Sequence, residues 1–450
     1  MTDQLTTPAP APESPQPPSP RRLPRALTPF RHSAYRRLGI ALVLGAFAGG
    51  VWVVALVWEV IRIGGGAGQL SVVSTAGAVG VLLPALLGGV VADRVPQKLI
   101  LLVVAAVETT GMAIVALLSW TDRTEVWHLA VVSFATGAAM AFYYPAYSAW
   151  LPALVPEEDL MAVNGFEGMV RPTVGQALGP ALAGIVVGAV STSAALGLAA
   201  AFHVLGIIAL TAVPLTAVRR ASVDDEEEAA PASVLADMRE GFAYMVRTPW
   251  LLATLLFASV MLLVMMGPLE VLIPFLVKDK LDGGPGDHAA VLAAFGIGGA
   301  VGSMVMASLQ MPRRYLTWMN LMWGLACLPF FVMGIAGHIW VIVAMAFLSG
   351  VLFSAPMVIW GTLLQRRVPP HLLGRVASLD FFVSISLMPV SLALAGPVAS
   401  WIGVEATFTI AAVVPVVAAV LAVWLAKLPA DELANPLRDA PQAEPEASVR

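Results

Sequence analysis

The chain has 450 residues, of which 58% are apolar and only 12% are charged. Soluble domains carry about 25% charged residues, so this composition excludes a disordered chain and a nucleic-acid-binding protein and argues against a soluble enzyme. At about 20 residues per membrane helix, the apolar content suffices for about a dozen helices. The single cysteine, Cys327, leaves no internal disulfide and no cysteine-cluster metal site.

The first segment, 1–37, differs from the rest of the chain. It holds nine prolines between Pro8 and Pro29, together with six arginines. A segment of this composition cannot bury a core, so we expect a disordered or extended tail. A second polar tail, 429–450, follows the last apolar block.

Between the tails, apolar blocks recur with short polar breaks, and long blocks without alternation predict membrane helices. We expect twelve spans, near residues 38–61, 70–91, 98–119, 127–150, 164–189, 194–217, 250–276, 288–309, 316–336, 340–362, 379–402 and 406–427. With this assignment, 20 of the 25 basic residues lie on the side of both termini, and four lie on the other side. Because basic residues mark the cytoplasmic side, we expect both termini in the cytoplasm of a cell-membrane protein.

One long polar stretch, 219–249, divides the chain into two halves, 38–218 and 250–428. The stretch holds an acidic run at 224–228, which we interpret as a solvated linker. Apolar residues at helical spacing then follow over 234–246, and they predict an amphipathic helix along the cytoplasmic face.

The two halves resemble each other in sequence. Val155-Pro156, after span 4, recurs as Val368-Pro369 after span 10, at an offset of 213 residues, and Glu59 recurs as Glu270 at an offset of 211. The chain is therefore predicted to be an all-α membrane protein of twelve helices in two pseudo-symmetric six-helix bundles. Similar halves of this kind are typical of transporters, whose substrate site lies between the halves.

The loop between spans 2 and 3 carries the most specific motif, a tight turn with a carboxylate flanked by cations. Here the sequence resembles the major facilitator superfamily, and the matching residues are Gly89, Asp93, Arg94 and Lys98. Pro96 and Gln97 depart from the family pattern, which has a second glycine and a basic residue there. The resemblance covers residues 38–428 and implies that these charges lock and release the helices. Asp380, at the start of span 11, is a plausible partner for Arg94.

Span 5 contains a second motif, formed by Gly175, Gly179, Pro180 and Gly184. Small residues at this spacing let helices pack closely, and the proline bends the helix. The motif resembles the one typical of exporters in the superfamily, and it favours efflux over uptake. The runs 145–160 and 364–376 are similar to the branch that exports drugs and siderophores. Span 4 departs from many proton-coupled relatives because Ser133-Phe-Ala-Thr136-Gly137 lacks their arginine.

Ionisable residues inside spans are costly and therefore mark functional candidates. The candidates for proton coupling are Glu59, Glu108, Glu270, Glu167 and Arg171. Glu167 and Arg171 have the spacing of an intrahelical ion pair, which is the alternative to a coupling role. Glu59 and Glu270 could instead be hydrated carboxylates at the membrane boundary. His203 could be a hydrogen-bonded core histidine rather than a proton relay.

Aromatic residues of the expected cavity helices are the candidates for substrate contact: Phe142, Tyr143, Tyr144, Phe353 and Trp360. An apolar cavity with few charges suits amphipathic compounds, although aromatic packing is the alternative. The sequence offers no ATPase motif, and we expect no metal, no cofactor, no enzymatic activity and no nucleic-acid partner.

Together these patterns predict a monomeric secondary transporter that is embedded in the lipid bilayer and driven by protons. It is predicted to export drug-like compounds by alternating access. Export of a siderophore or another self-made metabolite, nutrient symport, and a non-transporting membrane sensor or scaffold are the alternatives. The choice between protons and sodium stays open at this point.

Overall fold

The computed structural model describes residues 25–92, 94–215 and 234–437, and every regular element in these ranges is a helix. The N-terminal half comprises η1 (Arg25–Arg31), α1 (Ser33–Arg62), α2 (Ala67–Leu82), α3 (Ala85–Ala92), α4 (Gln97–Trp120), α5 (Val126–Leu154), α6 (Glu157–Val170), η2 (Arg171–Leu178), α7 (Gly179–Ala189) and α8 (Thr192–Thr211). The C-terminal half comprises α10 (Val234–Arg247), α11 (Pro249–Gly267), η3 (Pro268–Leu272), α12 (Ile273–Phe275), η4 (Leu276–Lys280), α13 (Pro285–Ser308), α14 (Tyr315–Leu325), α15 (Leu328–Ile335), α16 (Ile339–Arg367), α17 (Pro370–Ser386), α18 (Met388–Ile402), α19 (Val404–Leu425) and α20 (Leu428–Ala434).

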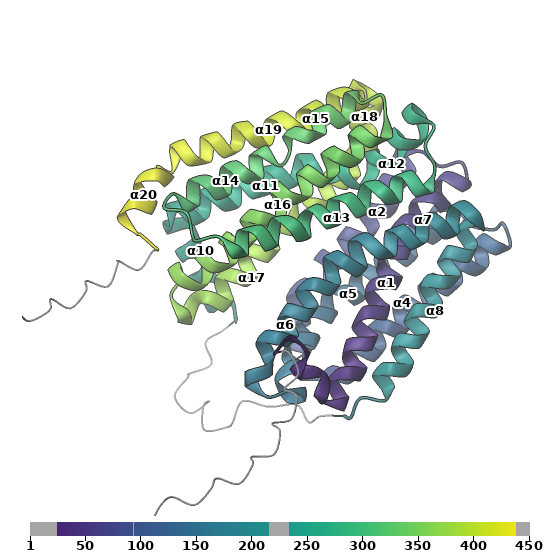
Figure 1. Ribbon diagram of the computed structural model, residues 1–450, viewed down its shortest axis with the longest axis horizontal. Coiled ribbons are helices and arrows are strands. Elements are labelled where there is room, and N and C mark those ends of the chain that lie inside the picture. The colour runs from purple at the N-terminus through teal and green to yellow at the C-terminus, as the bar shows by residue number, and fades with distance from the viewer. Residues whose placement is uncertain (1–24, 93, 216–233, 438–450) are drawn as a thin grey trace, which may run out of the picture.

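Eleven stretches of the described chain are long and apolar enough to cross a membrane. The twelfth span is divided: α2 and α3 together cover residues 67–92, with an interruption at Leu83-Pro84. A proline cannot donate a backbone hydrogen bond, which accounts for the break. The arrangement is the predicted one of twelve helices in two six-helix bundles (Figure 1).

Two predicted span boundaries are wrong by more than five residues: span 6 ends at Thr211 rather than 217, and span 11 begins at Leu372 rather than 379. The apolar part of span 5 begins at Ala162, close to the predicted 164, although its helix already begins at Glu157. The helices of spans 5 and 11 begin directly at or after a proline and have polar first turns, so the apolar pattern misses their first residues. As a consequence, Asp380 lies well inside α17 and not at the start of the span.

Close backbone contacts at glycines hold helices together inside each bundle. A Cβ atom on Gly80 of α2 would lie 2.3 Å from the carbonyl oxygen of Phe134 in α5. In the other bundle, a Cβ on Gly298 of α13 would lie 2.1 Å from the carbonyl oxygen of Phe347 in α16. The Gly296-Ile-Gly298-Gly299 run is therefore a helix-packing surface, as its place inside a span predicts.

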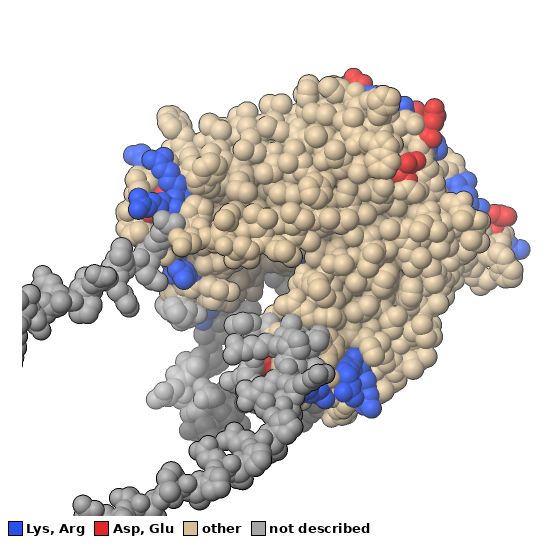
Figure 2. All heavy atoms as spheres, viewed as in Figure 1, with Lys and Arg blue, Asp and Glu red and all other residues tan. Residues whose placement is uncertain are grey.

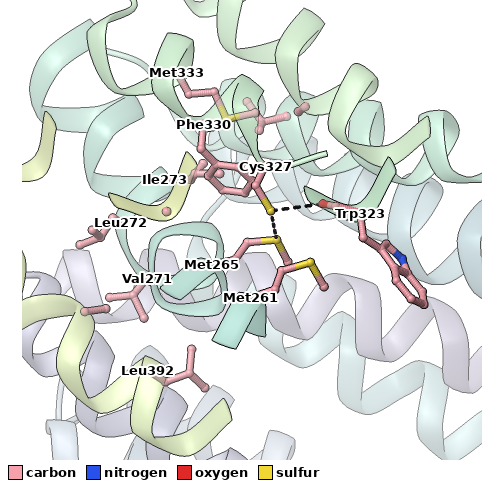
Figure 3. Packing of buried hydrophobic residues seen from close by; sticks show 14 of the residues in the cluster. Met261, Met265, Val271, Leu272, Ile273, Trp323, Cys327, Phe330, Met333 and Leu392 are labelled. Carbon is pink, nitrogen blue, oxygen red and sulfur yellow. Dashed lines mark hydrogen bonds between the residues drawn. The ribbon is translucent and has the colours of Figure 1, made fainter. Parts of the chain in front are cut away.

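The core of the C-terminal bundle forms where span 7 packs against span 9 (Figure 3). Cys327 is fully buried there, and its Sγ lies 3.6 Å from Sδ of Met265 and 3.7 Å from the carbonyl oxygen of Trp323. Met261, Phe330 and other apolar side chains surround the thiol in the same view. Dispersion contacts of this density fix the position of span 7 inside its bundle.

The internal repeat has the same local geometry in both halves. Val155 follows α5 and Val368 follows α16, and both residues end their helices in an extended conformation. The prolines after them stand at the N-caps of α6 and α17. The residue before a proline is restricted to extended conformations, so the repeated Val-Pro pair ends one span and starts the next.

We call the end of the molecule that bears η1, α10 and α20 the tail end, and the opposite end, with the connections at 63–66, 190–191, 281–284 and 403, the loop end. At the loop end the bundles touch: the backbone N–H of Gly396 in α18 donates a 2.9 Å hydrogen bond to Oγ of Ser71 in α2. A Cβ on Gly184 of α7 would lie 2.6 Å from Cβ of Ala289 in α13. These two contacts form a seal between the halves.

The bundles separate toward the tail end (Figure 1). One hydrophobic cluster runs through both bundles and includes Val57, Ala183 and Ala289. A second cluster, with Tyr147 and Leu210, is confined to the tail end of the N-terminal bundle. Figure 2 shows a hollow between the bundles on the tail side, and an uncharged band between charged ends. The structure is therefore closed at the loop end and open at the tail end.

Each bundle carries a short helix clasped to its tail end. Thr28 Oγ1 in η1 donates a 2.5 Å hydrogen bond to Asp159 in α6, and His32 Nε2 lies 3.1 Å from the same carboxylate. The hydrogen bond from Thr28, with that from His32, lowers the pKa of Asp159. In the other bundle, Glu432 of α20 is 1% exposed and accepts a 2.8 Å hydrogen bond from the backbone N–H of Leu316 at the start of α14.

The amphipathic helix predicted after the acidic run is present as α10. The acidic run itself, most of the N-terminal tail, Asp93 and residues 438–450 lie outside the described residues.

Candidate functional site

Arg171 is the only basic residue predicted inside a span, and it begins the π-helical segment η2. Its guanidinium carbon lies 4.4 Å from the ring centroid of Tyr144 in α5, and both side chains are exposed. Glu167, one turn earlier in α6, is half-buried. Within the described chain, Arg171 and Glu167 form no ion pair, so the arginine is held by a cation–π contact instead.

The turn from Glu167 to Arg171 is α-helical, because the backbone N–H of Arg171 donates to the carbonyl oxygen of Glu167. The two residues therefore have the i,i+4 spacing of a pair but do not form one, and the π-helix begins only at Arg171. Arg171 stands at the junction, with Pro172 after it. Single π-turns inside membrane helices occur frequently at functional sites.

Glu108 and His203 form a second charged site inside the N-terminal bundle. Glu108 lies at the middle of α4, and His203 lies near the middle of α8. Oε2 of Glu108 is 3.6 Å from Nδ1 of His203, and the two side chains are 14% and 7% exposed. Tyr143 lies on α5, which packs against α4, and its ring contacts those of Tyr144 and Tyr147 with centroids at 5.5 and 5.7 Å.

Glu59 has a different environment from the one expected at a membrane boundary. It is fully buried at the loop end of α1, and Arg62 donates hydrogen bonds to both of its carboxylate oxygens at 2.8 and 2.9 Å. Ser119 Oγ of α4 donates a further 2.9 Å hydrogen bond, and Arg62 also binds Asp122 at 2.6 Å. With three such donors, the Glu59 carboxylate is part of a structural hydrogen-bond network.

Glu270 stands at the matching place of the other half, in the π-helical segment η3. It is exposed, while Val271 and every residue from there to Val277 are buried. The segment η3 that bears Glu270 contacts α2 of the other bundle, so the residue stands at the boundary between the halves. Among the described residues, Glu270 has no hydrogen-bond or ion-pair partner. The two halves thus place one carboxylate in a network and leave the other without a partner among the described residues.

Two of the residues predicted for the gating loop and its latch, Lys98 and Asp380, are bonded to other partners. Lys98 Nζ donates to the carbonyl oxygens of Thr211 and Val213 at 2.8 and 2.5 Å, so it caps the C-terminus of α8. Asp380 accepts a 3.0 Å hydrogen bond from Trp360 Nε1, within its own bundle. Arg94 is exposed, Gly89 lies in α3, and Asp93 is outside the described residues. The structure does not bring Arg94 and Asp380 together.

The span-5 motif lies where three helices meet. Gly179 and Pro180 pack against Gly50 of α1, where an added Cβ would lie 2.8 Å from either residue. Gly184 packs against α13 of the other bundle, as described for the seal, whereas a Cβ on Gly175 would come no closer than 3.8 Å to α1. The motif therefore joins span 1 to the interface between the halves.

The predicted substrate-contact residues fall into two groups. Tyr144 is 37% exposed, and Phe142, Tyr143 and Phe353 are half-buried. Trp360, by contrast, is 7% exposed and packs between Trp250 and Trp323, with ring centroids at 6.2 and 6.3 Å. Its indole N–H donates a hydrogen bond to Asp380, and the ring is buried rather than part of an exposed surface.

The sequence pattern does not predict which side chains on other helices bind the candidate residues. Ser119 for Glu59, His203 for Glu108 and Ser71 for the seal are each supplied by a different span. Polar residues in apolar blocks single out these positions as candidates, but the pairing depends on which helices are neighbours.

Comparison with known proteins gives the family. Residues 25–449 match a family model described as "Transmembrane secretion effector". Over 349 residues the chain is 25% identical to macrolide efflux protein A of Streptococcus pyogenes, which covers 76% of this chain and 84% of that protein. Over 391 residues it is 26% identical to the multidrug efflux pump Tap of Mycobacterium tuberculosis strain H37Rv, with 84% and 89% covered.

Solved structures agree on the fold. The nucleoside transporter NupG, in a mutant form, superposes with a TM-score of 0.69 at 11% identity, covering 86% of this chain and 98% of that chain. A POT family transporter in complex with 5-aminolevulinic acid superposes with a TM-score of 0.67 at 13% identity, covering 87% and 96%. The chain belongs to the transmembrane secretion effector family of major facilitator superfamily transporters, and it is a multi-pass membrane protein.

Proposed function

We propose that this protein is a proton-driven exporter of small amphipathic, drug-like compounds. The observation that carries the proposal is the asymmetry of the interface between the bundles. The halves are sealed through Ser71–Gly396 and Gly184–Ala289 and are open at the tail end. A two-bundle protein caught open on one side only is one state of an alternating-access cycle.

Efflux is favoured over uptake by the relatives and by the interface motif. The relatives are a macrolide efflux protein and a multidrug efflux pump. The exposed cation–π pair of Arg171 and Tyr144 offers contacts for compounds with an apolar body and a polar or charged group. The exporter-type glycines of span 5 lie at the interface that must open and close during transport.

Proton coupling is proposed because several carboxylates stand inside the spans, where protonation removes the cost of a charge. Glu108, Glu167 and Glu270 are the open candidates, with Arg171 as the nearby cation. Glu59 is disfavoured because its ion pair with Arg62 occupies both oxygens. We propose no enzymatic reaction, metal, cofactor or nucleic-acid partner for these groups, and a monomer as the working unit.

The tail end is proposed to face the cytoplasm of a cell membrane. Basic residues concentrate at this end, including Arg36, Arg37, Arg313 and Arg314, and such a bias sets orientation. The opening on the tail side then receives substrate from the cytoplasm or the inner leaflet.

The test is accumulation of a fluorescent or labelled drug panel, including a macrolide, in cells with and without the protein. We expect lower accumulation in expressing cells, and we expect a protonophore to abolish the difference. If expressing cells still accumulate less drug under a protonophore but lose this difference when sodium is removed, sodium rather than protons is the coupling ion. Higher accumulation would indicate a symporter. Equal accumulation of every compound in cells with and without the protein would contradict drug export. Export of a self-made metabolite or a scaffold role would then be the remaining alternatives.

A further inference from the structure

The Glu108–His203 site lies away from the cleft that the substrate would enter. It is formed between α4 and α8, and both side chains are nearly buried. The site consists of one acid, Glu108 on α4, and one base, His203 on α8. The carboxyl group is negative when deprotonated, and the imidazole is positive when protonated. The 3.6 Å separation is an ion-pair distance but is longer than a direct hydrogen bond.

The surroundings of the pair contain few other titratable groups. On α5 the titratable side chains of this region are Tyr143, Tyr144 and Tyr147, while His128 accepts a hydrogen bond from the backbone N–H of Glu125 at the loop end. On α1, charged residues stand only near the two ends, before Gly39 and after Trp58, and α7 has none. Apart from Lys98, Glu108 and His203, α4 and α8 carry no charged side chain.

A carboxylate and an imidazole in such a place are neutral together when they hold one proton between them. Losing that proton leaves a net negative charge and gaining another leaves a net positive charge, and both are costly in a poorly hydrated interior. The proton count of the pair therefore responds to changes in hydration and in nearby charge.

A row of aromatic side chains on α5 leads from the neighbourhood of α4 to Arg171. Tyr143 lies on α5, which packs against α4, and its ring is edge-on to that of Tyr144 with centroids 5.5 Å apart. Tyr144 carries the guanidinium of Arg171 on its face, and both are exposed. A change of charge or hydration at Arg171 can thus reach Tyr143 through these contacts.

We propose that Glu108 and His203 form a proton-binding site, offset from the substrate cleft, whose protonation alternates during transport. A proton arriving from the loop side is taken up by the pair and is released toward the tail side, with no other bond made or broken. Tyr143 is a positioning residue that links the pair to Arg171. This inference rests on the proposed exchange of substrate for protons.

The test uses the full-length protein in proteoliposomes with two assays. The first is drug accumulation driven by an imposed pH gradient, and the second is exchange of labelled for unlabelled drug without a gradient. We expect Glu108→Gln and His203→Gln to lower driven accumulation by at least about tenfold and to keep exchange within about twofold. Glu108→Asp keeps a titratable group and should keep driven accumulation with a shifted pH profile.

His288→Gln is the matched control, because His288 is a second buried histidine, 2% exposed, with no ion-pair partner among the described residues. It should keep driven accumulation. Where a single glutamine variant fails to fold, the double variant supplies a neutral amide pair and carries the same expectation. Folding is checked by thermal unfolding in detergent.

Normal driven accumulation in folded Glu108→Gln and His203→Gln proteins would overturn the inference. Loss of exchange together with driven accumulation would also overturn it, because the pair would then serve substrate passage. Uncoupling by Glu270→Gln but by neither of these variants would move the proton site to the cleft. Absence of driven accumulation in the unsubstituted protein would instead refute the proposed function, a distinct outcome.

Discussion

At the scale of single residues, three carboxylates inside the spans have three different environments. Glu59 is ion-paired and hydrogen-bonded, Glu108 faces a histidine, and Glu270 is exposed without a partner among the described residues. A paired carboxylate at a helix end contributes to stability, whereas an incompletely paired one can change its protonation. The environments therefore predict different consequences for the same Glu→Gln change.

Glu59→Gln should destabilise the protein while leaving transport per folded molecule unchanged. Breaking a buried ion pair is costly, but Arg62 is one-third exposed and keeps Asp122, so we expect a loss of roughly 1–3 kcal/mol. Ser119→Ala removes one hydrogen bond of the same network and should cost about 1 kcal/mol. Thermal unfolding in detergent measures both, and an uncoupled but fully stable Glu59→Gln protein would contradict this assignment.

The clasp of η1 on α6 should depend on pH in one direction. Because hydrogen bonds from Thr28 and His32 lower the pKa of Asp159, the clasp is stabilised above the ordinary carboxyl pKa and is lost as the pH falls through the lowered value. At neutral pH the clasp should therefore hold, and Asp159→Asn should loosen it. Trypsin cleavage after Arg31 at neutral pH measures this; equal cleavage rates in both proteins would count against the clasp.

At the scale of helices, glycine contacts determine which spans can approach each other. Gly50 of α1 has no room for a side chain, since a Cβ there would lie 2.6 Å from the carbonyl oxygen of Gly175. Gly49, its neighbour in the same helix, has nothing within 4 Å. The two positions share sequence context and helix propensity and differ only in what they contact.

Gly50→Ala should therefore cost roughly 1–3 kcal/mol, because the atoms it would overlap belong to the backbone and to Pro180. Gly49→Ala should be neutral or stabilising by up to about 1 kcal/mol, since alanine favours the helix. Thermal unfolding of the two variants side by side is the measurement. Equal destabilisation of both would show that α1 and span 5 are not packed as described.

Most of the helical arrangement could be predicted from the sequence, because long apolar blocks and Val-Pro breaks are local signals. The first turns of α6 and α17 could not, since polar residues there continue a helix beyond the apolar block. The spacing of Glu167 and Arg171 is that of an intrahelical ion pair, but the Arg171 guanidinium lies over the ring of Tyr144 on another helix, which spacing within one helix cannot predict. His203 was recognisable as a buried histidine, but its pairing with Glu108 depends on α4 and α8 being neighbours.

At the scale of the whole molecule, the seal at the loop end and the opening at the tail end must exchange during transport. Spin labels at Gly188 and Gly286 report the loop end, and labels at Leu99 and Gly374 report the tail end. All four positions are exposed, and the three glycines have nothing within 4 Å of an added Cβ. Cys327→Ala removes the one native thiol.

Pulsed dipolar spectroscopy should show the two label pairs changing in opposite directions between conditions that favour different states, such as acidic and neutral pH. The loop-end distance should lengthen as the tail-end distance shortens. Parallel changes at both ends, or no change at either under any pH or drug condition, would contradict a cycle of two exchanging openings.

The most direct test of proton-driven export is drug uptake into proteoliposomes under imposed pH gradients of both signs. An antiporter exchanges protons leaving the lumen for drug entering it, in either orientation of the protein. For proton-driven export we predict that the drug accumulates when the lumen is acidic and does not accumulate when the gradient is reversed. A protonophore should abolish the accumulation. Accumulation only when the outside is acidic would indicate symport and would contradict the account, as would no response to either gradient.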